Sequence, residues 1–102
     1  MEVQKMVLEY FGLHNQLRQL QEEAAELSLV INHLFRGRKQ LIDLMDEMAD
    51  VEIMIDQMKL YYGTDIFDRI KKNKLTRIRD EIITRKFNEQ CEADARLEDC
   101  SH

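Results

Sequence analysis

The sequence contains no proline, no tryptophan and only three glycines among its 102 residues. All-β domains need turn-forming residues at regular spacing, so their scarcity here argues against a β fold and favours long helices. No apolar run approaches the roughly 18 residues that a membrane span requires. The N-terminus also lacks the extended apolar region of a signal peptide. We therefore expect a helical protein that is not inserted in a membrane.

Cysteine is scarce as well, and Cys91 and Cys100 are the only two thiols. Both lie near the C-terminus, and two such thiols fit a reducing compartment in which they stay free. This pattern indicates a cytoplasmic protein. The formal net charge is −5, and an acidic balance argues against a dedicated nucleic-acid-binding protein.

The length and composition are those of one small folded domain. The hydrophobic fraction of 44% is too high for a disordered segment. A core built from about 100 residues is marginally stable alone, because a small domain buries a small share of its surface. We therefore expect association into a homo-oligomer, either a homodimer or a homotetramer.

The three glycines divide the chain into helical segments. Apolar residues recur at helical spacing before Gly12, Gly37 and Gly63, and glycine commonly follows the C-terminus of a helix. Because the connections are short, consecutive helices should pack antiparallel. The expected fold is all-α, an antiparallel bundle of about four helices that oligomerisation completes. The expected helices span residues 2–11, 14–36, 39–62 and 64–88.

Residues 1–88 make up the expected helical domain. Residues 89–102 contain five acidic residues, one arginine and little apolar periodicity. We expect this last segment to be a polar tail or a fraying helix end.

Acidic side chains interrupt the apolar stripe of the second expected helix. Leu27, Val30 and Leu34 mark this stripe. At about 100° per residue, Glu23 lies within about 40° of all three, and Glu26 lies about 60° from Glu23. Both acids therefore share the face that should pack inward. One such pair alone is most often a solvated helix turn.

The third expected helix repeats the pattern 24 residues later, with Glu47 and Asp50 among Leu44, Val51 and Met54. If both stripes face one core, four carboxylates converge in it. Neither helix offers a lysine or arginine within this inward arc, so a divalent cation is favoured over ion pairing as the compensation for their charge. Carboxylate oxygens suit Mg²⁺, with Mn²⁺ as a possible substitute.

Two acidic motifs on consecutive helices have the spacing of a known signature. Glu22-Glu23-Ala24-Ala25-Glu26 and Glu47-Met48-Ala49-Asp50 resemble the EExxE…ExxD motifs of the MazG-like all-α nucleoside triphosphate pyrophosphohydrolases. The resemblance covers roughly residues 11–85, and it is greatest to the short, single-domain members of the phage and Gram-positive type. It implies Mg²⁺-dependent hydrolysis of a nucleoside or deoxynucleoside triphosphate to the monophosphate and pyrophosphate.

The resemblance also implies roles for the acidic residues. Glu23, Glu26, Glu47 and Asp50 would hold the metal. Glu22 would be the catalytic residue that activates water or binds a second metal, although an ordinary exposed acid is an equally good interpretation of its position. The chain lacks the tryptophan that some members stack against the base, so the base and the sugar stay open.

The fourth expected helix offers cations for a triphosphate. Lys71 and Lys74 fall inside the arc of its apolar residues, Arg77 falls at the edge, and Lys72 falls outside. A lysine within an apolar arc needs an anion or must extend to solvent. We expect Lys71, Lys74 and Arg77 to bind phosphate, and pairing with the carboxylates is the alternative.

Amide side chains near the acids are candidates for base recognition. Gln16 and Gln19 share the side of Glu23, and they could contact a base or support the metal ligands. His14 could lie at the mouth of the site, although a lone histidine there is more often a surface residue. The alternative to an enzyme is a non-catalytic helical interaction module whose acids bind a structural divalent cation or a basic partner.

Overall fold

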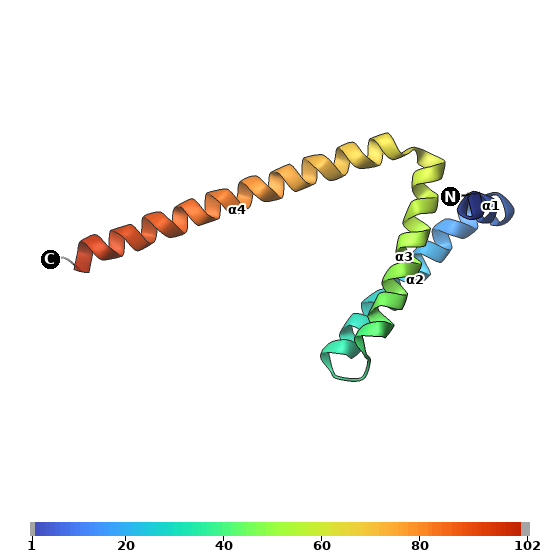
Figure 1. The fold of residues 1–102 in the computed structure, drawn as a ribbon, viewed down its shortest axis with the longest axis horizontal. Coiled ribbons are helices and arrows are strands. Elements are labelled where there is room, and N and C mark those ends of the chain that lie inside the picture. Colours follow the sequence, from blue (N-terminus) through green and yellow to red (C-terminus); the bar gives the residue numbers. More distant parts are fainter. Residues whose placement is uncertain (1, 101–102) are drawn as a thin grey trace. The chain divides into compact units, whose positions relative to one another are not determined.

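A computed structural model describes residues 2–100 of the chain, and side chains are described for residues 2–97. This part of the chain contains no strand, which confirms the expected all-α class. Within it, no helix has both the length and the hydropathy that crossing a lipid bilayer requires. The helices are α1 (Glu2–Phe11), α2 (Leu13–Phe35), α3 (Leu41–Tyr62) and α4 (Thr64–Cys100) (Figure 1).

Glycine ends α2 as the sequence predicts. Gly37 adopts a φ of 71°, a left-handed conformation that side chains with a Cβ rarely adopt. Its N–H donates to the carbonyl of Leu34 at 3.0 Å, and the N–H of Arg38 donates to the carbonyl of His33 at 2.9 Å. These two bonds form a Schellman motif, which satisfies carbonyl groups at the end of the helix and turns the chain towards α3.

A side chain in the first turn of α3 caps the N-terminus of this helix. The backbone N–H of Gln40 donates to Oδ2 of Asp43 at 2.8 Å, which is one half of a capping box. The carboxylate also lies at the positive end of the helix dipole. The connection between α2 and α3 is therefore residues 36–40, with defined hydrogen bonds on both sides.

The last helix is longer than the sequence predicts. α4 continues through residues 89–100, for which the sequence predicts a polar tail or a fraying helix end. Cys91 on this extension is an exposed free thiol. The side chain of Cys100 lies outside the described residues.

The chain forms two compact units, Met1–Thr64 and Asp65–His102. In the first unit α2 and α3 lie side by side and run antiparallel, and α1 contacts both of them (Figure 1). The expected antiparallel packing therefore holds for the central pair of helices. Among the side chains of residues 2–97, those of Gln16, Met54 and Gln57 are buried.

The second unit is a single helix. Every described side chain of α4 from Asp65 to Leu97 is exposed, the apolar ones included. Ion pairs between residues one turn apart, Arg85 with Glu81 and Arg96 with Glu92, decorate its surface. Exposed pairs of this kind contribute little to stability.

Candidate functional site

A buried pair of amides fixes the register of the α2–α3 hairpin. Nε2 of Gln16 donates to Oε1 of Gln57 at 2.6 Å, and both side chains are buried. Glu23 and Asp50 lie seven residues from this bond along their helices, towards the connecting loop, and the charge of Glu23 acts on Asp50. Seven residues make about two helical turns, so each acid lies on the same face as its amide. The antiparallel pairing therefore brings the acids of the two helices together.

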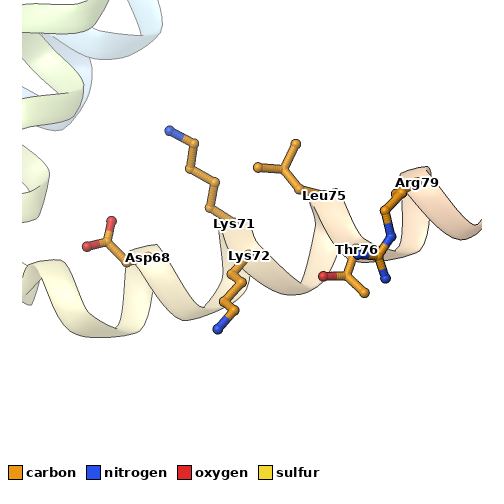
Figure 2. Close-up of a pocket in the computed structure, with 6 residues that line it drawn as sticks. All are labelled: Asp68, Lys71, Lys72, Leu75, Thr76 and Arg79. Carbon is orange, nitrogen blue, oxygen red and sulfur yellow. The ribbon is translucent and has the colours of Figure 1, made fainter.

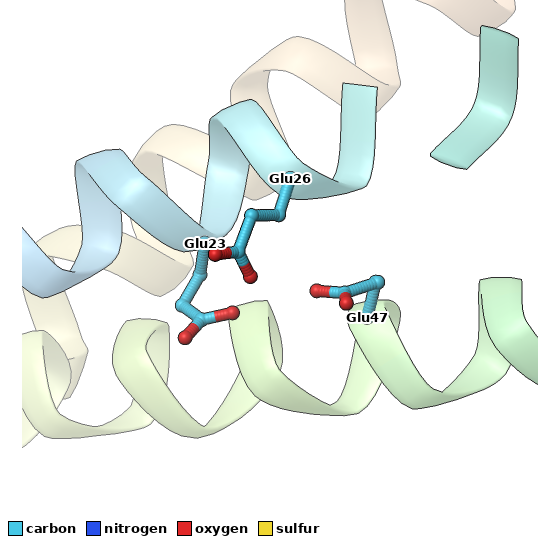
Figure 3. A group of neighbouring side chains, drawn as sticks. All are labelled: Glu23, Glu26 and Glu47. Atoms are coloured by element: carbon cyan, nitrogen blue, oxygen red, sulfur yellow. The ribbon is translucent and has the colours of Figure 1, made fainter. Parts of the chain in front are cut away.

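The carboxylates gather in two overlapping groups. In the first group, Glu23, Glu26 and Glu47 each place an oxygen within 4.8 Å of the other two, and Figure 3 shows the three carboxylates converging between the helices. The second group consists of Asp46, Glu47 and Asp50, so Glu47 belongs to both. Three of the four acids that the sequence proposes as metal ligands thus share the first group, and Asp50, the fourth, joins Glu47 in the second.

These acids differ in their exposure. Glu23, Glu47 and Asp50 are half-buried, whereas Glu26 and Asp46 are exposed. Asp46 was missing from the sequence prediction. It precedes Asp50 by four residues, so the same helical geometry that grouped the other acids could have found it.

The clustered negative charges raise the pKa of two of these groups. Burial raises the pKa of Glu47 above its ordinary value, and repulsion from Glu26, Asp50, Glu23 and Asp46 adds to the rise. Burial also raises the pKa of Asp50, followed by repulsion from Glu23 and Asp46. Each shift reflects the cost of holding the ionised form beside other anions.

Two carboxylate oxygens in the group lack a donor. Oε2 of Glu23 and Oε2 of Glu47 are both buried and accept no hydrogen bond. A buried anionic oxygen without a donor is unfavourable, and a divalent cation is the compensation that oxygen ligands of this kind suit best. The residues therefore fit the metal that the sequence predicts.

The residues predicted to assist the metal ligands or to contact a base lie in different surroundings. Gln19 donates from Nε2 to Oε1 of Glu23 at 2.8 Å, so it orients a carboxylate as a residue behind a metal ligand would. Gln16 instead bonds to Gln57. His14 is exposed. Glu22 is also exposed and lies outside both carboxylate groups, at the rim of a cleft between α1, α2 and α3.

The predicted phosphate-binding residues all lie on α4. Lys71 and Lys74 border a shallow groove with the apolar side chains of Phe67, Ile70 and Leu75, as their helical phase predicts. Figure 2 shows Lys71 and Lys72 extending to different sides of the helix.

Another shallow groove on α4 is bordered by Lys74, Arg77 and Ile78. All of these side chains are exposed. Since α4 belongs to the second unit, the part of Lys71, Lys74 and Arg77 in a site with the carboxylates stays a prediction.

No family model, curated protein or solved structure matches this chain. The functional interpretation is therefore based on the chemistry of the residues and on the resemblance of the two acidic motifs.

Proposed function

We propose that the chain is a Mg²⁺-dependent nucleoside triphosphate pyrophosphohydrolase of the MazG-like type. The observation that carries the proposal is the convergence of Glu23, Glu26, Glu47 and Asp50, with a buried, donor-free oxygen on Glu23 and on Glu47. Two acidic motifs on antiparallel helices are the arrangement that the resemblance implies. The free thiol of Cys91 fits work in the reducing cytoplasm.

The four carboxylates would hold Mg²⁺, or Mn²⁺ as a substitute. When bound, the ion supplies positive charge that neutralises phosphate oxygens and the charge developing on them. Gln19 keeps Glu23 oriented by the hydrogen bond to its carboxylate. Glu22, outside the ligand groups, would accept a proton from water or orient it.

The triphosphate needs further cations, and we assign this role to Lys71, Lys74 and Arg77. Their ammonium and guanidinium groups suit phosphate oxygens. The same helix leaves apolar side chains exposed, including Phe67, Ile70 and Ile78. We propose that a homodimer or a homotetramer covers them.

A screen of pyrophosphate release tests the enzymatic proposal directly. The eight common ribonucleoside and deoxynucleoside triphosphates are each incubated with the full chain and Mg²⁺, and in parallel with Mn²⁺ or with a chelator. We expect release from at least one substrate that depends on the metal. Absence of release from all eight with either ion would contradict the proposal, and cation binding without hydrolysis would favour the non-catalytic interaction module.

A further inference from the structure

The connection between α2 and α3 gathers positive charge in an otherwise acidic chain. It contains Arg36, Arg38 and Lys39, and no acidic residue occurs between Glu26 and Asp43, whereas the whole chain has a formal net charge of −5. The three cations are exposed. With the side chains of residues 2–97 they form no ion pair. Their charge is therefore available to an anionic partner.

An aromatic ring stands beside these cations. Phe35 is the last residue of α2, and its side chain is 85% exposed, the largest fraction among the exposed large apolar side chains of residues 2–97. A single exposed apolar side chain is ordinary on a protein surface. A ring next to three uncompensated cations is a more specific combination, because rings stack on nucleobases and cations bind phosphate. We call residues 35–39 the basic turn.

The backbone of the basic turn is fixed from both sides. The N–H groups of Gly37 and Arg38 donate to carbonyls in the last turn of α2, and the N–H of Gln40 donates to the carboxylate of Asp43. A Cβ placed on Gly37 would meet no atom of the described residues within 4 Å, so this side of the turn is open. A partner therefore meets an ordered backbone, and binding costs less conformational entropy than it would with a flexible loop.

The basic turn forms one end of the α2–α3 hairpin, and α1 packs towards the other end (Figure 1). The turn is also distant from the carboxylates, since Glu26 and Arg36 are separated by about 15 Å along the axis of α2. A polyanion that lay along the hairpin would meet these acids and be repelled. A favourable contact with a polyanion is therefore confined to the turn, and it involves only a few anionic groups.

We propose that the basic turn binds single-stranded nucleic acid, with its three cations on phosphate groups and the ring of Phe35 stacked on one base. Guanidinium groups bind phosphate oxygens in pairs and also stack on bases. The faces of the bases are accessible in a single strand, whereas neighbouring base pairs cover them in a duplex. Stacking on an aromatic ring tolerates every base, so we expect little sequence preference. Such binding is independent of the proposed hydrolysis.

An anionic lipid surface is the competing partner for three cations. Attachment to lipid grows with the apolar area that the protein buries in it. The apolar side chains nearest to Phe35 in sequence are Leu34, which is half-buried, and Leu41 and Ile42, which follow on α3. The turn itself offers one ring, which is sufficient to stack one base and adds little apolar area for lipid. The observations therefore favour nucleic acid.

Fluorescence anisotropy of labelled DNA tests the proposal. A short oligothymidine strand and a duplex of the same length are each titrated with the full chain at low salt, in a chelator that prevents bridging by metal ions. We expect the strand to bind at least about fivefold more tightly than the duplex. Its log Kd should rise with the logarithm of the salt concentration with a slope of about 2, the value for three phosphate contacts. No binding of the strand, or equal binding of the duplex, would overturn the proposal.

Two pairs of matched substitutions locate the binding surface. Phe35→Ala should weaken binding of the strand roughly tenfold, the equivalent of one stacked base, whereas Phe87→Ala, at an exposed ring of α4, should not change it. Arg38→Gln should weaken binding and lower the salt slope by about 0.7. Arg69→Gln, at an exposed position of α4, removes the same charge and should change neither. Equal losses within either pair would contradict the assignment to the turn.

The competing partner and the fold are tested in the same series. Sedimentation of the chain with anionic vesicles that Phe35→Ala abolishes, without binding of the DNA strand, would replace the nucleic acid by a lipid surface. All four substituted positions are exposed, so circular dichroism should show an unchanged helix content. Pyrophosphate release by Phe35→Ala should match that of the unmodified chain. The enzymatic proposal and the nucleic-acid proposal can therefore fail separately.

Discussion

The α2–α3 hairpin and α4 organise their polar side chains in different ways. The hairpin has a bond between different helices, from Gln16 to Gln57 across 41 positions of sequence. On α4, the ion pairs join residues within one turn, such as Arg85 and Glu81. The site in the hairpin is therefore built from two helices. On α4, helical phase alone decides which side chains share a face.

The evidence for a functional role differs between the hairpin and α4. The hairpin concentrates like charges at a cost, since burial and repulsion raise the pKa of Glu47 and Asp50. Such unfavourable clusters are typical of functional sites. The lysines of α4 are exposed, so holding their charge costs little free energy. Any functional importance therefore depends on what they contact. Substitutions in the two regions test these two kinds of claim.

The largest effect is expected at Glu47, which belongs to both carboxylate groups. Glu47→Gln should lower kcat/KM for metal-dependent hydrolysis by a factor on the order of 10²–10³, because it removes an anionic ligand while preserving shape. Steady-state pyrophosphate release with Mg²⁺ measures this. Glu52→Gln, at an exposed position of the same helix, is the matched control. Equal kcat/KM in both variants would show that Glu47 does not contribute to metal-dependent hydrolysis.

The second largest effect is expected at Lys74, and it tests whether the position of a lysine around α4 decides its role. Lys74→Ala should lower kcat/KM by roughly 10²-fold, since it would remove a charge that we propose binds the triphosphate. Lys72→Ala changes net charge equally but alters a lysine outside the apolar arc, so it should change kcat/KM little. The two rates are compared in parallel at one ionic strength. Similar values would show that helical phase does not select the phosphate-binding lysine.

The apolar side chains of α4 predict an assembly. A single helix with exposed Phe67, Ile70 and Ile78 gains most of its stability from packing rather than from its own hydrogen bonds. Light scattering at micromolar concentration should therefore give a mass at least twice the 12.2 kDa of one chain. Ile78→Asp should reduce this mass, whereas Thr76→Asp should change it less. A monomer for the unmodified chain would contradict the prediction.

The smallest effect is a dependence of stability on pH without metal. The pKa values of Glu47 and Asp50 lie above their ordinary values of 4.5 and 3.8 in the folded chain. Between the ordinary and the raised values the folded state binds more protons, so the free energy of unfolding should rise as pH falls through that interval. The repulsion is fully present above the raised values.

Thermal unfolding in a chelator, followed from neutral pH downwards, measures this dependence. The Glu47→Gln variant should show a shallower rise, because one of the two shifted groups is gone. Adding Mg²⁺ at neutral pH should raise Tm by binding the folded state. A Tm that falls as the solution is mildly acidified would contradict the sign of both shifts.

The sequence was sufficient for the parts of the fold that depend on local geometry. Gly37 predicts the end of α2 because a left-handed residue is needed there, and the phase of Glu23 and Glu26 predicts which face they share. For the segment after residue 88 the sequence leaves a polar tail and a fraying helix end as alternatives, because a charged segment without apolar periodicity does not distinguish them.

The partner of Gln16 could not be predicted from one helix. The repeat of 24 residues aligns Gln16 with Gln40, but the helices pack antiparallel and the structure pairs Gln16 with Gln57. Helical phase gives the direction of a side chain, whereas the identity of its neighbour depends on the register between helices. The carboxylate cluster was predictable because both helices carry acids on the inward face.

The antiparallel register has a consequence for how this protein can change in evolution. A substitution on the outer face of the hairpin leaves the spacing between the amide pair and the carboxylates intact. One inserted residue between Gln16 and Glu23 would turn the acid by about 100° relative to the amide, so the two would no longer share a face. Insertions and deletions should therefore be confined to the connection at residues 36–40, while both helices keep their lengths between the paired positions.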